Sequence, residues 1–327
     1  HADIHVEALR IAPRILEADL HGNHRAGRHG FAGHRTRRQV LGRFEDAIRA
    51  GKRALMLDDS NALAHNYIGN ARMELKQYDL AVESFEAASR ADKTDEWPHF
   101  NIGVARIRQN RIVDAIAAFQ QAVELNPRNE KAQWTLGLCF KNQQKWEEAQ
   151  AAFAAALDLN PNNAAAAQEA GLAAIEAGNR EEAQQFGQKA TQLAPKQWLS
   201  WYVLGRAHYD QAEYATAAKA LAKATELETT TPTLFRLLAL ALGEVNDLEG
   251  AKAAADKCLA LDPKDGYPHL MRARAALELD KQPEAALAGL RKALENGVEP
   301  DDVYEWAWTK PLHETAGWKQ LQKDFPA

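Results

Sequence analysis

Residues 130–163 read EKAQWTLGLCFKNQQKWEEAQAAFAAALDLNPNN, and their pattern indicates the fold of most of the chain. Apolar residues recur in it at helical spacing on both sides of a pause near Gln144. Pro161 ends the second run, because proline lacks an N–H donor and disfavours the helical region for the residue before it. The stretch therefore predicts two helices joined by a short turn, which form a helical hairpin.

The same pattern recurs along the chain at a fixed interval of 34 residues. The interval is plainest in a series of alanines at the predicted helix crossings, which comprises Ala47, Ala81, Ala115, Ala149, Ala183, Ala217, Ala251 and Ala285. A fixed interval of this size is typical of a solenoid, in which each unit packs only on its neighbours. We therefore expect an all-α array with seven units that start near residues 62, 96, 130, 164, 198, 232 and 266.

The repeated residues resemble the tetratricopeptide repeat. The resemblance rests on a set of small, aromatic and turn-forming residues at fixed positions, which in one unit are Leu136-Gly137, Ala149, Phe153, Ala156 and Pro161. The preceding unit has the same or similar residues at the equivalent positions. The resemblance implies a right-handed superhelical solenoid of stacked helix-turn-helix hairpins.

Two units depart from this plan. In the unit that starts near residue 266, Ala286, Leu290 and Ala293 fit the second helix better than the residues before them, so we expect this helix to be displaced by one residue. In the unit at 164–197, Gly187 stands where earlier units have phenylalanine. Because a missing large side chain leaves a core underfilled, we expect a loosely packed seam in that unit.

The array occupies residues 44–294, between two regions of different composition. Residues 1–43 are rich in Gly, His and Arg, which favours disorder, a stretch foreign to the native protein, or a degenerate first helix. Nucleic-acid binding by this arm is not expected, since nothing in it reads a base, and the four histidines at His21, His24, His29 and His34 have no fixed scaffold for a metal. Residues 295–327 break the period and predict a helical cap built around three tryptophans, Trp306, Trp308 and Trp318.

The sequence lacks the local motifs of common enzymes. There is no Gly-x-Ser-x-Gly, no complete phosphate loop and no Cys-x-x-Cys pair. Cys139 and Cys258 stand at small-residue positions and are interpreted as packed thiols. We therefore expect a chain that is not an enzyme and that uses no metal and no cofactor.

The location of the protein is predicted from two absences. No apolar run approaches the roughly 18 residues that would span a bilayer, and the beginning of the chain lacks the plan of a secretory signal. Both absences favour a cytoplasmic protein without a membrane span. Because the chain begins with His1 rather than Met, we also expect either a fragment or a chain from which something was removed.

The resemblance places certain positions of each first helix on the concave face of the solenoid. The candidate binding residues at these positions are Asn66, Asn70, Trp97, Phe100, Asn101, Val104, Lys131, Trp134, Leu138, Lys141, Tyr202, Arg206 and Tyr209. Tryptophan and tyrosine supply large contact areas and are enriched at interaction hot spots. The set predicts an aromatic groove with basic points that binds a peptide or protein segment, although some of these rings could instead seal neighbouring hairpins.

Some relatives hold a carboxylate through five clamp positions, which here are Asn66, Asn70, Asn101, Lys131 and Thr135. Three of the five match, but Asn66 and Thr135 remove two of the three cations. The sequence thus predicts a noncatalytic interaction scaffold, with a weak peptide-carboxylate site around Lys131 as one form of it. The alternative is an accessory or regulatory module whose catalytic part lies on another chain or a missing segment.

Overall fold

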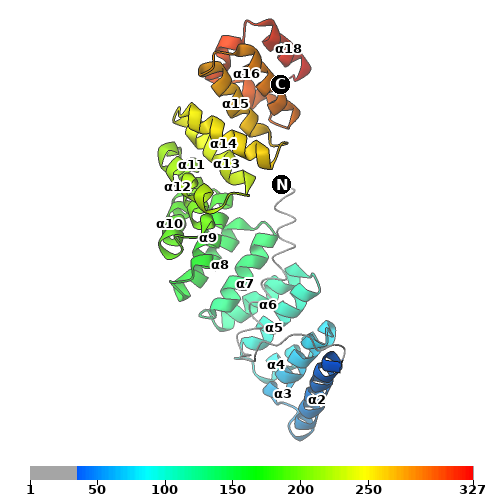
Figure 1. The fold of residues 1–327 in the computed structure, drawn as a ribbon. Helices are drawn as coiled ribbons and strands as arrows, with labels where there is room; N and C mark the ends of the chain where they lie inside the picture. Colours follow the sequence, from blue (N-terminus) through cyan, green and yellow to red (C-terminus); the bar gives the residue numbers. More distant parts are fainter. Residues whose placement is uncertain (1–34, 327) are drawn as a thin grey trace. The chain divides into compact units, whose positions relative to one another are not determined.

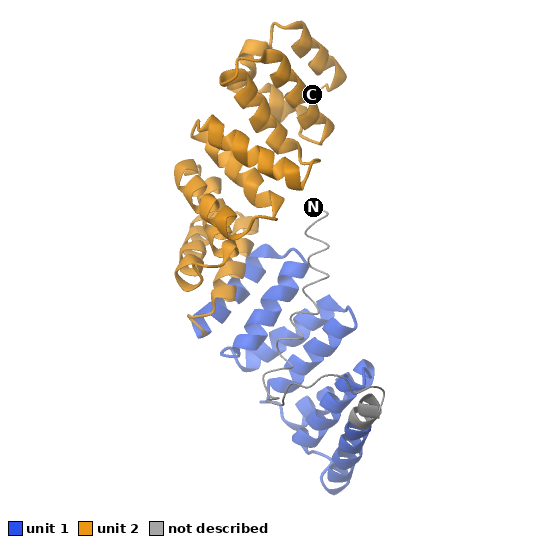
Figure 2. Cartoon of the chain, viewed as in Figure 1, with its two compact units in different colours: residues 1–159 blue, residues 160–327 orange. Residues whose placement is uncertain are grey.

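The structure is a computed structural model that describes residues 35–326, with side chains described from residue 42 onward. The described residues are all-α and form consecutive helical hairpins, which confirms the predicted fold class (Figure 1). The chain divides into two compact units, residues 1–159 and residues 160–327 (Figure 2). Most of the predicted arm 1–43 lies outside the described residues, and its last part, from Arg35, is helical.

Unit 1 contains one long helix followed by three hairpins. Their bounds are α2 Arg35–Leu57, α3 Ala62–Glu74, α4 Tyr78–Ala91, α5 Trp97–Arg108, α6 Ile112–Leu125, α7 Glu130–Asn142 and α8 Trp146–Leu159. Each first helix packs on its own second helix and on the second helix of the preceding hairpin within the unit.

Unit 2 contains four hairpins followed by three short elements. The hairpins are α9 Ala164–Ala177, α10 Arg180–Leu193, α11 Trp198–Asp210, α12 Tyr214–Leu227, α13 Pro232–Glu244, α14 Leu248–Leu261, α15 Gly266–Glu278 and α16 Pro283–Glu295. The short elements are α17 Pro300–Tyr304, the 3-10 helix η1 Ala307–Leu312 and α18 Ala316–Asp324.

Asparagine side chains define the start of three first helices. The side chains of Asn61, Asn129 and Asn163 each accept a hydrogen bond from the backbone N–H three residues later. Such an N-cap satisfies a donor that has no partner within the helix and contributes about 1 kcal/mol. The repeat therefore encodes its helix boundaries locally.

The turn inside every hairpin places one residue in the left-handed region. These residues, all with positive φ, are Lys76, Asn110, Gln144, Gly178, Ala212, Asn246 and Lys281. The first six follow the 34-residue interval, whereas Lys281 comes one residue late. Ala286, Leu290 and Ala293 are accordingly buried in α16, together with Leu294, which confirms the predicted displacement.

Ala212→Gly should stabilise the protein by about 0.5–1 kcal/mol. Ala212 has a φ of 60°, where a Cβ is strained and glycine is not, and this relief exceeds the entropy that glycine adds to the unfolded chain. Urea unfolding measures the change. Ala253→Gly on the exposed surface of α14 is the control and should destabilise by about 1 kcal/mol; a loss of stability in Ala212→Gly would contradict the expected strain.

The core of unit 1 consists of phenylalanine rings packed on glycines. Phe85, Phe119 and Phe153 are fully buried on the second helices. A Cβ built on Gly137 would lie 2.8 Å from two ring carbons of Phe153, and the glycines facing the other two rings are equally close. Glycine is therefore required in these first helices because the ring occupies the space of its side chain.

The unit at 164–197 fills its core differently, and the expected underfilled seam is not present. Val203, from the following first helix, occupies the space above Gly171 that a phenylalanine ring fills in unit 1. A Cβ on Gly187 would lie 2.8 Å from the Cα of Leu204, so the backbones of α10 and α11 meet at this glycine. The sequence alone suggested a void because the neighbouring helix that enters it belongs to the next repeat.

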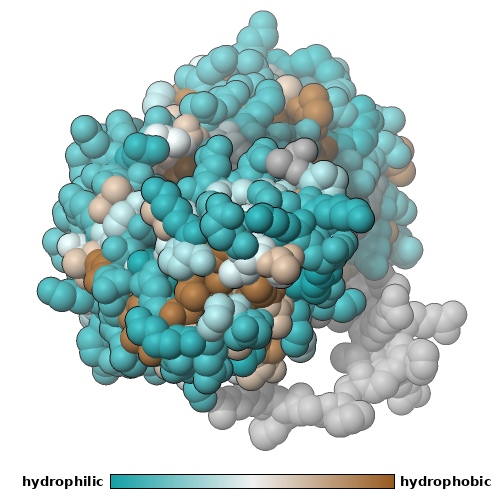
Figure 3. All heavy atoms as spheres, turned by 90° about the horizontal axis from the view of Figure 1, so that it is seen from above, coloured by the Kyte–Doolittle hydropathy of each residue, from teal (hydrophilic) through white to brown (hydrophobic). Residues whose placement is uncertain are grey.

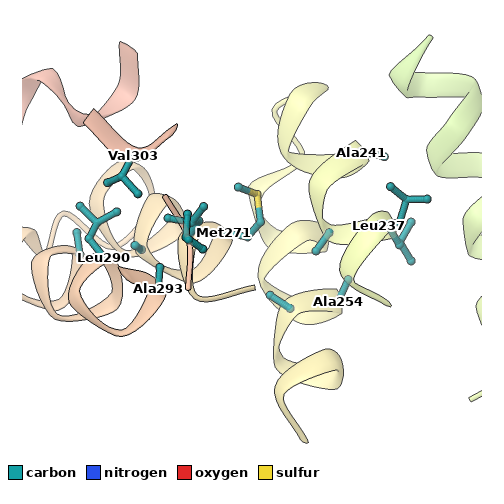
Figure 4. Close-up of a cluster of buried hydrophobic side chains, with 14 of the residues drawn as sticks. Leu237, Ala241, Ala254, Met271, Leu290, Ala293 and Val303 are labelled. Carbon is teal, nitrogen blue, oxygen red and sulfur yellow. The ribbon is translucent and has the colours of Figure 1, made fainter. Parts of the chain in front are cut away.

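One hydrophobic cluster extends from the middle of unit 2 to its last helix. Figure 4 shows part of it, with Leu237 from α13, Met271 from α15, Leu290 from α16 and Val303 from α17. Trp318 of α18 is buried in the same cluster, as are Leu312 and Leu321. The three short elements thus cover the apolar side of the last hairpin.

Candidate functional site

The first helices of unit 1 carry ten of the predicted binding residues. Asn70, Trp97 and Lys131 are exposed, whereas Asn66, Asn101, Val104, Trp134 and Lys141 are partly buried. Phe100 and Leu138 are each only 8 % exposed, so they offer little surface to a ligand. The first helices of three successive repeats therefore each present at least one exposed side chain of the predicted set, but the set as a whole is not exposed.

The aromatic residues form a path from the surface into the core. The rings of Trp97 and Phe100 meet edge to face with centroids 5.6 Å apart, and Phe100 meets Phe119 at 5.4 Å. Trp134 packs in the same manner on Phe153, at 5.2 Å. Edge-to-face pairs of this kind stabilise beyond their area. Phe100 therefore supports the ring of Trp97, which itself remains 44 % exposed.

Two of the five clamp positions serve structural contacts. The Asn66 amide donates to Asp95 at 3.4 Å, which links α3 to the start of α5. Thr135 is buried, and its hydroxyl donates to the backbone carbonyl of Lys131 at 2.8 Å. Asn70 and Lys131 are the exposed clamp positions, and Asn101 is partly exposed, as is Asn66.

Two exposed apolar residues of α3 were missed by the sequence-based selection. Leu63 is 64 % exposed and Tyr67 is 65 % exposed. Both lie on a first helix at positions equivalent to Trp97 and Asn101 in the next repeat. The register of the repeat could have identified them, since Leu63 has the same position as Trp97.

In unit 2, Tyr202, Arg206 and Tyr209 lie on α11 and are partly buried. The Arg206 Nε donates to both carboxylate oxygens of Asp210, at 2.9 and 3.1 Å. Tyr209 packs edge to face on Tyr214 at 5.3 Å, and burial raises the pKa of Tyr209 to about 12. The phenol of Tyr209 is therefore neutral at physiological pH and acts as a hydrogen-bonding, not a charged, group.

Chemically reactive groups are scarce in the described part of the chain. Burial raises the pKa of both the Cys139 and the Cys258 thiol to about 12, so neither is a thiolate at neutral pH. Between residues 35 and 326 no cluster of three or more His, Cys, Asp or Glu side chains could hold a metal ion. The histidines at 21, 24, 29 and 34 lie outside these residues. None of the helices described has both the length and the apolar content needed to cross a membrane.

Apolar side chains reach the surface in small patches. Figure 3 shows one face of the molecule, which is mainly hydrophilic and has brown, hydrophobic residues gathered between the polar ones. On α3 and α5 the exposed apolar side chains are Leu63, Tyr67 and Trp97. A contiguous exposed apolar patch marks an interaction site more often than scattered apolar residues do.

Comparisons with solved structures give the fold. YrrB, described as a tetratricopeptide-repeat protein with an unusual peptide-binding site, is 20 % identical, with a TM-score of 0.51 over 57 % of this chain and 96 % of YrrB. The C-terminal part of a tetratricopeptide-repeat protein from Cytophaga hutchinsonii is 16 % identical, with a TM-score of 0.51 over 70 % of this chain and 98 % of that chain. MamA is 28 % identical, with a TM-score of 0.43 over 49 % of this chain and 88 % of MamA.

The family follows from sequence models. No curated protein sequence matches the chain. Models described as "Tetratricopeptide repeat" match residues 37–96, 100–164, 140–197, 200–231 and 237–265. Repeats of this family bind proteins or peptides and are generally noncatalytic. The chain therefore belongs to the tetratricopeptide repeat family and is, in general terms, a protein-interaction scaffold.

Proposed function

We propose that the first-helix face of α3, α5 and α7 binds an extended peptide segment of a partner protein. The observation that carries this proposal is the exposure of Leu63, Tyr67 and Trp97, three large apolar side chains on the first helices of adjacent repeats. Keeping such side chains in water is unfavourable by about 25 cal/mol per Å² of apolar surface, so a partner that covers them gains affinity.

Polar groups beside the apolar residues suit a peptide backbone. Asn70 and Asn101 lie on the same two helices as the apolar residues, and a side-chain amide can both donate to a carbonyl and accept from an N–H. An extended segment presents one unpaired N–H and one unpaired C=O per residue. Lys131 adds a positive charge on α7, which favours an acidic group or a chain end in the bound segment.

Trp97 is expected to be the main anchor of the peptide. Its ring is held by Phe100 and so loses little conformational freedom when a ligand covers it. The buried Phe100 is a poor residue for testing the site, because its removal would disturb the contact with Phe119. The scaffold role is noncatalytic: the proposed face binds and orients a partner without changing it.

Trp97→Ala should weaken the binding of selected peptides by about 30-fold, the effect of losing about 2 kcal/mol at a hot spot. The experiment selects binders from a random peptide library on the full chain and measures each by calorimetry. Tyr67→Ala should weaken the same peptides to a smaller extent.

Val113→Ala is the matched control, because Val113 is an exposed apolar residue on the second helix α6. It should leave peptide binding unchanged. Peptides that bind Trp97→Ala as tightly as the unaltered protein, while both unfold at the same urea concentration, would contradict the proposed site.

A further inference from the structure

Unit 2 contains two arginine–carboxylate pairs at the same position of two repeats. In α11 the Arg206 Nε donates to Asp210, at 2.9 and 3.1 Å, and in α15 the Arg274 Nε donates to Glu278 at 3.2 Å. Both pairs are four residues apart, and Arg206 and Arg274 are separated by two repeats of 34 residues. The two pairs therefore permit a direct comparison within one unit.

The guanidinium of Arg274 is satisfied by the preceding hairpin. Its Nη1 donates to the carbonyl of Gly243 at 2.8 Å, and its Nη2 donates to the side-chain oxygen of Asn246 at 3.2 Å. The Arg274 side chain is 18 % exposed. Asn246 is the left-handed residue of the turn between α13 and α14, so the turn supplies an oxygen acceptor to the arginine.

Arg206 lacks the equivalent acceptor. The residue of the α9–α10 turn that corresponds to Asn246 is Gly178, which has no side chain. Among the described residues, Asp210 is the hydrogen-bonding partner of Arg206, and the contact uses its Nε. The Arg206 side chain is 36 % exposed, twice the value for Arg274. The two terminal amino groups of the guanidinium are thus available as donors.

A hollow of about 230 Å³ lies at this place. Its lining residues are Ile175, Gly178, Arg180, Ala183, Arg206, Ala207 and Asp210. A Cβ added to Gly178 would meet nothing within 4 Å, so the hollow is open where Asn246 has its amide. One edge is held in place because the Gln211 side chain donates to the carbonyl of Arg180 at 3.1 Å.

We infer that this hollow binds a carboxylate of a partner. Its oxygens replace the missing turn acceptor and accept hydrogen bonds from the terminal amino groups of Arg206. A carboxylate suits the fork geometry of a guanidinium and makes hydrogen bonds about twice as strong as those of a neutral amide. Arg180 and Arg206 outnumber Asp210 among the charged lining residues, while Glu176, which is not part of the lining, adds a negative charge that acts on Arg206. Ile175, Ala183 and Ala207 provide apolar contact for the methylene groups that precede an acidic side chain's carboxylate.

The site is separate from the face proposed on α3, α5 and α7, and its contacts lie wholly within unit 2. The carboxylate could belong to a glutamate side chain or to a chain end. Three short probes distinguish these sources: acetyl-Gly-Glu-Gly-amide, acetyl-Gly-Gln-Gly-amide, and acetyl-Gly-Gly-Gly with a free carboxylate. The full chain, labelled with ¹⁵N, is titrated with each probe at constant ionic strength, because salt screens such contacts.

The Arg206 Nε–H and Gly178 N–H signals should shift on addition of the glutamate probe, with an affinity at least about fivefold higher than for the glutamine probe. If the triglycine acid binds more tightly than the glutamate probe, the carboxylate is supported and a chain end is its source; tighter binding of the glutamate probe supports a glutamate side chain. Equal binding of the glutamate and glutamine probes, or no shift with any probe, would overturn the inference.

Two reciprocal variants keep the test independent of a folding defect. Gly178→Asn places an amide where Asn246 has one, and asparagine already occupies this left-handed position at Asn110 and Asn246. It should abolish the response of Arg206 to the glutamate probe. Asn246→Gly should create a response at Arg274 that the unaltered protein lacks. Retained binding at Arg206 in Gly178→Asn would refute the site.

Discussion

Phe153→Ala should lower the free energy of unfolding of unit 1 by about 3–5 kcal/mol. The Phe153 ring is fully buried, lies on Gly137 and meets the Trp134 ring edge to face. Its removal loses the transfer free energy of the ring and leaves a cavity between α7 and α8. Urea unfolding followed by circular dichroism measures the change, and amide exchange of α7 and α8 locates it. Val113→Ala, at an exposed position, should change stability by less than about 0.5 kcal/mol.

A double-mutant cycle with Gly137→Ala tests whether the ring and the glycine act as a pair. Alone, Gly137→Ala places a Cβ 2.8 Å from two ring carbons, which should cost about 1–3 kcal/mol through overpacking. In the Phe153→Ala background the ring is gone, so the added methyl group should cost little or nothing. Additive losses in the double variant would show that the glycine is not required by the ring.

Gly187→Phe should destabilise unit 2, although it gives the repeat the aromatic residue found at this position in three repeats of unit 1. A Cβ at residue 187 would lie 2.8 Å from the Cα and 3.0 Å from the backbone nitrogen of Leu204. A backbone cannot rotate aside as a flexible side chain does, so we expect a loss of about 1–3 kcal/mol for Gly187→Ala and a larger loss for Gly187→Phe.

Urea unfolding and amide exchange of α10 and α11 provide the measurement. Gly42→Ala is the matched control, because Gly42 is also helical and an added Cβ would meet nothing within 4 Å. The free energy of unfolding of this control should rise by up to about 1 kcal/mol, because alanine has a higher helix propensity than glycine. A Gly187→Phe variant more stable than the unaltered protein would show that the position is a void, as the sequence alone suggested.

The predictions that held depend on local signals. The 34-residue interval is visible directly in the sequence, and the turn prolines act within a few residues of the chain, so both predict the hairpins without a structure. The displacement of the second helix in the last repeat also has a local signal, since one extra residue in the turn shifts the buried series to Ala286. Family membership follows from the same residues.

The candidate site was harder to predict because exposure depends on neighbouring repeats. Phe100 and Trp97 both occupy first-helix positions expected to face a ligand, yet the first is buried against Phe119 and the second remains exposed. Leu63 was overlooked because the selection favoured aromatic residues, yet its side chain is exposed in the structure. Position within a repeat therefore narrows the choice of residues without deciding which ones reach the surface.

The hairpins and the family can be predicted from the residues alone. The packing between repeats makes Gly187 a close backbone contact rather than a gap. It also gives the terminal amino groups of Arg274 hydrogen-bond acceptors, whereas Arg206 bonds to Asp210 through its Nε. The physical reason is the range of the interactions. Helix capping and turn formation are settled within one segment, whereas packing and hydrogen-bond satisfaction depend on atoms supplied by a helix of another repeat.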